Sequence, residues 1–68
     1  MMTNLKALSA RIYESGYKKK WIAAQCGMSR ASFYNKLVGK TEFTQTEIAK
    51  LKEILQLKPA EADKIFFG

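Results

Sequence analysis

Gly16, Gly27 and Gly39 divide residues 1–40 into short segments, each of which spaces its apolar residues as a helix does. Glycine adopts positive φ at no steric cost, so it commonly marks the place where a helix ends. Apolar residues recur three and four positions apart within each segment. We therefore predict three short helices, over about residues 4–15, 18–26 and 30–38.

The remainder of the chain carries start signals for two further helices. Thr44-Gln45-Thr46-Glu47 matches a capping box ahead of an apolar stripe, which predicts a helix over about residues 45–55. Pro59 suits the first turn of a final helix. Ser29 is the expected N-cap of the third helix, and Thr3 or Asn4 that of the first. No segment alternates apolar and polar residues, so we expect an all-α, compact five-helix domain without strands.

Chain length and composition indicate a single small domain over residues 1–68. A chain of 68 residues buries only about 60% of its unfolded surface, enough for one modest core. No apolar run approaches the roughly 20 residues that span a bilayer, and no leader pattern opens the sequence, so we expect no membrane association and a cytoplasmic location. Cys26 is the only cysteine and histidine is absent, so we expect no disulfide, metal or cofactor, and Cys26 as a small core residue.

Positive charge is concentrated in one part of the sequence. The net charge is +6, yet residues 1–40 hold eight Lys or Arg against the single acid Glu14, and residues 41–68 hold four against five acids. A one-sided basic surface on a small domain favours a polyanionic partner, because neutralising phosphates releases condensed counterions.

Residues 18–38 combine two short helices with a glycine-containing turn, the signature of a helix-turn-helix. The motif needs a small residue where the helices cross, a glycine four residues later and apolar residues that point inward. Ala23, Gly27, Met28 and Phe33 meet these conditions in order. The second helix of such a motif enters the major groove of DNA.

The run from Ile22 to Phe33, IAAQCGMSRASF, resembles the helix-turn-helix of the Cro and lambda-repressor (XRE-like) family, and Gly39-Lys40 also matches. The predicted helix over residues 45–55 and the C-terminal segment from Pro59 onward resemble the corresponding parts of small phage and prophage regulators. Lys18 stands where the family usually has Thr, Ser or Asn, and Trp21 stands at a place that is usually polar.

The resemblance implies which side chains contact DNA. Positions that read bases in the family fall on Ser29, Arg30, Ala31, Tyr34 and Asn35. Arg30 and Asn35 are the strongest candidates, since Arg pairs with guanine O6 and N7 and Asn with adenine N6 and N7. Positions expected to contact the DNA backbone are Lys18, Lys19, Lys20, Ser32, Lys36 and Lys40.

We therefore expect a sequence-specific regulator of transcription, a Cro-like repressor that binds a palindromic operator in double-stranded DNA as a homodimer. Catalysis and a small-molecule substrate are not expected, because the acids are spread over helix caps and faces and no phosphate-binding glycine loop is present. Two alternatives stay open: a protein-interaction module such as an antirepressor or an inhibitor of a host protein, and an excisionase or plasmid copy-control protein. Side chains expected to contact a second copy or a partner are Trp21, Phe66 and Phe67.

Overall fold

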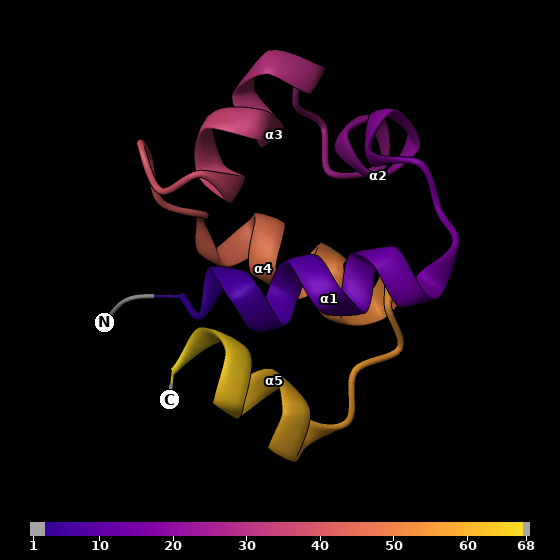
Figure 1. The fold of residues 1–68 in the computed structure, drawn as a ribbon, viewed down its shortest axis with the longest axis vertical. Coiled ribbons are helices and arrows are strands. Elements are labelled where there is room, and N and C mark those ends of the chain that lie inside the picture. Colours follow the sequence, from indigo (N-terminus) through magenta and orange to yellow (C-terminus); the bar gives the residue numbers. More distant parts are fainter. Residues whose placement is uncertain (1–2, 68) are drawn as a thin grey trace.

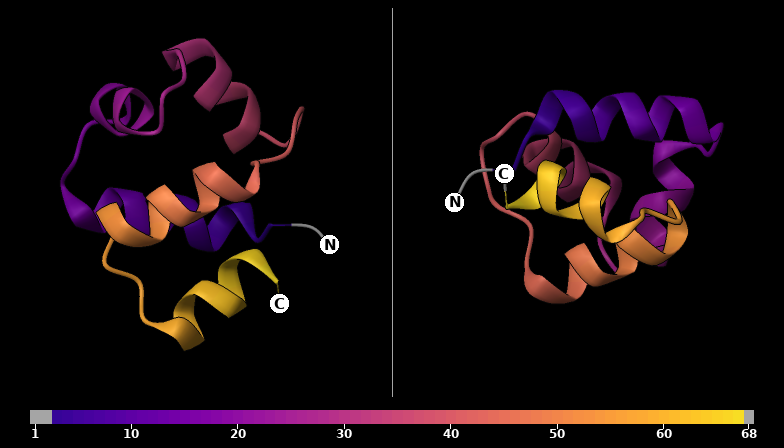
Figure 2. Two further views of the ribbon diagram at one scale, coloured as in Figure 1. Left: turned by 180° about the vertical axis from the view of Figure 1, so that it is seen from behind. Right: turned by 90° about the horizontal axis from the view of Figure 1, so that it is seen from below.

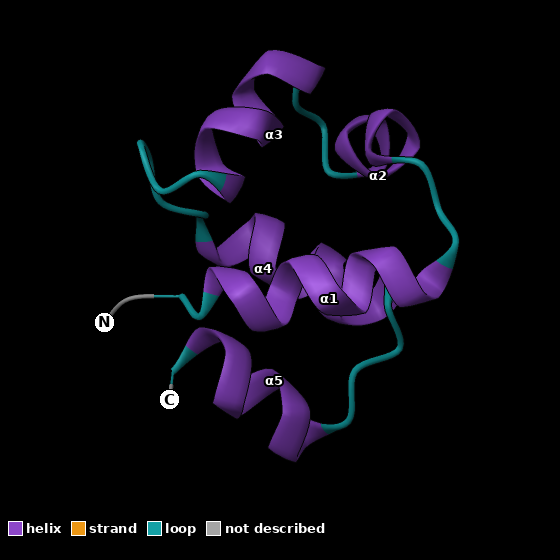
Figure 3. Cartoon of the chain, viewed as in Figure 1, coloured by secondary structure: helices purple, strands orange, loops and turns teal. Residues whose placement is uncertain are grey.

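The computed structural model describes residues 3–67, which form five helices and no strand (Figures 1 and 3). The helices are α1 (Leu5–Ser15), α2 (Lys19–Gln25), α3 (Arg30–Leu37), α4 (Gln45–Ile54) and α5 (Pro59–Phe66). The all-helical prediction is thus confirmed for this part of the chain. Residues 1, 2 and 68 of the predicted domain lie outside it.

Side chains that the sequence marked as caps begin three of the helices. Asn4, rather than Thr3, caps α1, and its Oδ1 accepts a backbone N–H of the first turn at 3.1 Å. The Oγ of Ser29 caps α3 in the same way, also at 3.1 Å. At α4 both halves of the predicted capping box are present: Thr44 Oγ1 accepts from the Glu47 N–H, and Glu47 Oε1 accepts from the Thr44 N–H. These contacts satisfy backbone donors that have no partner within the helix.

The helices are arranged so that α1 and α4 lie between two ends of the molecule. The pair α2 and α3 forms one end and α5 the other, as Figure 1 and the left view of Figure 2 show. One apolar cluster joins them, because each helix turns its apolar face inward. The buried core consists of Leu8, Ile12, Ile22, Ala23, Phe33, Phe43, Ile48, Leu51, Leu55, Ala62, Ile65 and Phe66.

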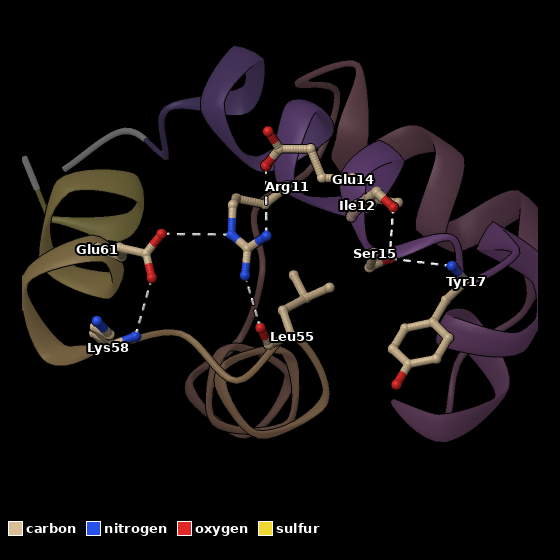
Figure 4. A network of polar contacts seen from close by, with 8 residues as sticks. All are labelled: Arg11, Ile12, Glu14, Ser15, Tyr17, Leu55, Lys58 and Glu61. Atoms are coloured by element: carbon tan, nitrogen blue, oxygen red, sulfur yellow. Dashed lines mark hydrogen bonds and ion pairs between the residues drawn. The ribbon is translucent and has the colours of Figure 1, made fainter.

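Arg11 connects three elements at the α5 end (Figure 4). Its Nη2 donates to the carbonyl of Leu55, just after α4, at 2.9 Å. Its Nε lies 3.5 Å from a carboxylate oxygen of Glu61 on α5, and Nη1 lies 3.4 Å from Glu14 on α1. The guanidinium thereby holds α1 against α5 and against the residue that follows α4. A backbone hydrogen bond from Asn4 N to Ile65 O, 2.6 Å long, joins the start of α1 to the end of α5.

The fold corrects one predicted partner contact. Phe66 is only 2% exposed and belongs to the core, because Ala62, Ile65 and Phe66 share the inward face of α5. A buried ring cannot contact a second molecule, so the prediction for Phe66 is wrong. Its neighbour Phe67 remains 40% exposed.

Candidate nucleic-acid interface

The connection between α2 and α3, residues 26–29, is a tight turn held by backbone hydrogen bonds. Gly27 has φ +75°, and the N–H of Met28 donates to the carbonyl of Ala23 at 3.0 Å. A Cβ on Gly27 would meet no atom within 4 Å, so the turn requires glycine for its dihedral angle and not for space. Ala23 is 1% exposed, and its small side chain lets the two helices approach closely. The turn therefore sets the angle between α2 and α3.

A groove runs between the start of α2 and the flank of α3. Lysines 18–20 come from the first turn of α2, and Arg30 and Tyr34 come from α3. No carboxylate lines this groove, so the field of its cations is not cancelled locally. Its lining residues are Lys18, Lys19, Lys20, Arg30, Phe33, Tyr34 and Leu37. The groove thus combines four positive charges with a tyrosine hydroxyl, a set suited to an extended polyanion.

The outward face of α3 presents most of the side chains predicted to read bases. Arg30, Ala31 and Tyr34 are exposed, with Tyr34 at 60%, and Asn35 is half-buried. Phe33 points the other way, is 1% exposed, and meets the ring of Phe43 edge-on at 6.1 Å between centroids. This buried anchor fixes which face of α3 points outward.

The two predicted serines and Lys40 occupy different surroundings. Ser29 and Ser32 are both exposed at the start of α3, where Ser29 Oγ accepts the Ser32 N–H. Ser29 can still donate its own hydroxyl proton, because the cap uses only its acceptor. Lys40 is exposed beyond the far end of α3, and its backbone N–H donates to the Asn35 carbonyl at 2.9 Å. Lys40 therefore lies apart from the lysines that line the groove.

Lys36 does not belong to this surface, which corrects the prediction that it contacts the DNA backbone. Its Nζ lies 2.5 Å from Glu47 Oε1 on α4, and the two side chains are only 13% and 14% exposed. Burial alone would raise the pKa of Glu47, but hydrogen bonds from Lys36 and Thr44 outweigh it, so this pKa lies below its ordinary value of 4.5. Lys36 thus ties α3 to α4 and has no free charge to offer.

Two features of the surface were not predicted. Val38 is 48% exposed, four residues after Tyr34 and seven after Ala31, so it extends the same outward face. The spacing from Ala31 and Tyr34 carries this signal, but in the sequence Val38 marked only the predicted end of a helix. Trp21 packs against Tyr17, with ring centroids 4.8 Å apart, and both rings remain nearly half exposed.

Cys26, just after α2, is half-buried and packs against the core. Burial raises the pKa of its thiol, so the reactive thiolate is disfavoured at neutral pH. Residues 3–67 contain no group of acids and cysteine that could hold a metal ion. Within the same residues, no helix is both long and apolar enough to cross a membrane.

Comparison of the chain with profiles of known protein families, with characterised proteins and with solved structures finds no match.

Proposed function

We propose that this protein is a sequence-specific regulator of transcription, a Cro-like repressor that binds double-stranded DNA with α2 and α3 as a helix-turn-helix. The observation that carries the proposal is the groove between these helices, which has four cations and no carboxylate on its walls. The same two helices meet through a buried alanine and a glycine turn, as the motif requires.

In this proposal α3 enters the major groove and reads bases with its outward face. Arg30 donates two hydrogen bonds to guanine, and Asn35 pairs with adenine. The side chains of Ala31 and Val38 are apolar and suit contact with thymine methyl groups. Lys18, Lys19 and Lys20 neutralise phosphates beside the recognition helix, which holds its register on the duplex.

Homodimer formation follows from the size of one recognition helix, which covers only a few base pairs. Two copies related by a dyad read half-sites one helical turn apart, about 34 Å. The longest dimension of one copy is 28 Å, so two copies lying side by side fit this spacing. Phe67, exposed at the C-cap of α5, is the ring we assign to the contact between copies.

Selection of bound duplexes from a random pool, at about 150 mM salt, tests the proposal. We expect enrichment of a palindrome with half-sites one turn apart. Enrichment of a single half-site would retain DNA reading but reject the dimer. A pool without enrichment would reject the repressor and favour a helix-turn-helix fold used to bind protein.

Arg30→Ala then tests the role of α3 on the selected operator. Loss of a bidentate contact to guanine should weaken operator binding by about 1–3 kcal/mol and relax the preference at one base pair. Lys52→Ala is the matched control, because it removes an equally exposed positive charge from α4. Equal losses in the two variants would mean that Arg30 contributes only charge.

A further inference from the structure

We infer that Tyr17 and Trp21 form a second nucleic-acid site, a stacking platform for an unpaired base of single-stranded DNA or RNA. Reading of a duplex by α3 does not use these two rings, so the inference goes beyond the proposed function. It rests on the exposed ring pair, on its rigid support and on the charge beside it.

The ring pair offers a wide aromatic surface to solvent. The centroids lie 4.8 Å apart with the planes tilted by 38°, so each ring packs against the other. Tyr17 is nonetheless 46% exposed and Trp21 44% exposed. An aromatic surface of this kind stacks on a nucleobase irrespective of its identity, because every base has a π-face. Stacking in a duplex conceals that face, so an unpaired base is the natural occupant.

Local hydrogen bonds hold Tyr17 in place before any ligand arrives (Figure 4). Its backbone N–H donates to Ser15 Oγ at 3.1 Å, and this hydroxyl donates in turn to the Ile12 carbonyl at 2.6 Å. Gly16, between them, has φ +77°. Trp21 lies in the first turn of α2, just before the fully buried Ile22, so the helix holds its backbone. A ring pair that is already ordered loses little entropy when a base stacks on it.

The charges beside the rings suit the phosphates of a nucleic acid. Lys18, Lys19 and Lys20 lie between the two aromatic residues in sequence, and all three also line the groove beside α3. Residues 15–41 contain no Asp or Glu. A strand that stacks a base on the rings can therefore place its phosphates against these lysines. Alternation of aromatic faces with cations is the usual design of single-strand sites.

Titration of the intact protein with short oligo(dT), followed by fluorescence, tests the platform directly. Trp21 is the only tryptophan, so its emission reports on this site alone. We expect saturable quenching by oligo(dT), and about tenfold weaker binding of an abasic oligonucleotide of equal length. Tyr17→Ala should weaken oligo(dT) binding about tenfold and keep the Trp21 signal, whereas Tyr17→Phe should bind as the original chain does. Tyr13→Ala, which removes an exposed ring from α1, is the matched control and should leave binding unchanged.

Three outcomes would overturn the inference. Equal binding of oligo(dT) and the abasic strand would reduce the site to phosphate contacts of the lysines. Unchanged oligo(dT) affinity in Tyr17→Ala would show that the ring does not stack. Polyglutamate that quenches Trp21 and displaces oligo(dT) at equal charge concentration would assign the surface to an acidic protein.

Arg30→Ala separates this site from the groove, since it should weaken operator binding and change oligo(dT) affinity less than about threefold. A chain that binds oligo(dT) as expected but selects no duplex would reject the proposed function and retain this inference.

Discussion

The α2–α3 end differs from the rest of the molecule in how its positive charge is balanced: residues 15–41 contain no Asp or Glu, whereas α1, α4 and α5 each carry charges of both signs. At the α5 end Arg11 lies between two carboxylates, and Lys50 pairs with Glu53 on α4. At the α2–α3 end none of the exposed cations forms an ion pair within the described residues; these are Lys18, Lys19, Lys20, Arg30 and Lys40. The ion pairs of Arg11 with Glu61 and of Lys36 with Glu47 connect different helices, whereas unpaired cations close to one another repel and favour the binding of an external anion. Lys36 forms an ion pair, although Arg30 and Lys40, the nearest cations in sequence on either side, form none.

The largest effect is expected from Leu8→Ala, which removes a fully buried side chain from α1. The lost burial and the resulting cavity should lower the free energy of unfolding by about 2–5 kcal/mol, much of the stability of a small domain. Urea unfolding, monitored by circular dichroism, measures this loss of unfolding free energy. Ser9→Ala, on the exposed face of α1, should change stability by less than about 0.5 kcal/mol. A small effect at Leu8 would contradict the packing of α1 against the core.

Replacement of Lys18, Lys19 and Lys20 by glutamine should abolish most of the electrostatic attraction for DNA while leaving the fold intact. The slope of log affinity against log salt should fall by about 2.7 if each lysine meets one phosphate, which corresponds to about 100-fold weaker binding near 150 mM salt. The midpoint temperature of thermal unfolding should be unchanged or slightly raised, because three mutually repelling charges are removed.

The matched control for this triple variant replaces Lys52, Lys58 and Lys64, which are exposed on α4 and α5 and its N-cap. The change in net charge is the same, but the salt slope should change far less. If both variants lose affinity equally, binding depends on net charge and not on the groove.

Glu47→Gln tests the ion pair that joins the two ends. Glutamine retains the acceptor that caps α4 but cannot neutralise Lys36, which is 13% exposed, so we expect a loss of about 1–2 kcal/mol in unfolding free energy. Glu53→Gln, in an exposed pair with Lys50, should cost less than about 0.5 kcal/mol.

The same pair predicts a dependence of stability on pH. The pKa of Glu47 is lower in the folded chain than its ordinary value of 4.5, so its contribution is complete above that value and is lost as pH falls through the folded pKa. Urea unfolding in acid should therefore show a smaller loss of stability in Glu47→Gln than in the original chain. Identical acid profiles would contradict the pairing.

The smallest effect is expected from Gly27→Ala at the turn between α2 and α3. The added Cβ meets no atom within 4 Å, so only the left-handed dihedral opposes it, at a cost of about 1 kcal/mol. Gly27→Asn should cost less, because asparagine tolerates this conformation. Gly39→Ala should cost more than Gly27→Ala, because its Cβ would lie 3.3 Å from Leu5 Cδ1. In differential scanning calorimetry, the loss of stability should increase from Gly27→Asn to Gly27→Ala to Gly39→Ala.

Local signals in the sequence were sufficient to predict the five helices. The capping box of Thr44 and Glu47 and the glycine turn at Gly27 each act within a few residues, so their geometry is encoded where it forms. The inward position of Phe33 likewise follows from helical spacing. The unequal distribution of charge could also be predicted, because it follows from the numbers of Lys, Arg, Asp and Glu in residues 1–40 and 41–68.

Contacts between distant segments could not be predicted in this way. In sequence Lys36 lies between the exposed cations Arg30 and Lys40, and only the folded chain brings Glu47 of α4 against it. On α5 the sequence did not show which of Phe66 and Phe67 faces inward, since one residue rotates a side chain by about 100° around a helix. Tyr17 and Trp21 are only four residues apart, but the extended N-cap Lys18 lies between them, so helical spacing did not predict that their rings pack together. The DNA-contacting roles stay predictions that the selection experiment tests.

The hydrogen bond between Asn4 and Ile65 also governs when this fold can be completed during translation. The first helix packs against the last, so the inner face of α1 stays partly uncovered until α5 has been synthesised and has left the ribosome tunnel. Folding of the whole domain should then occur as one event once α5 is available, and not helix by helix, because a loop from Asn4 to Ile65 must close.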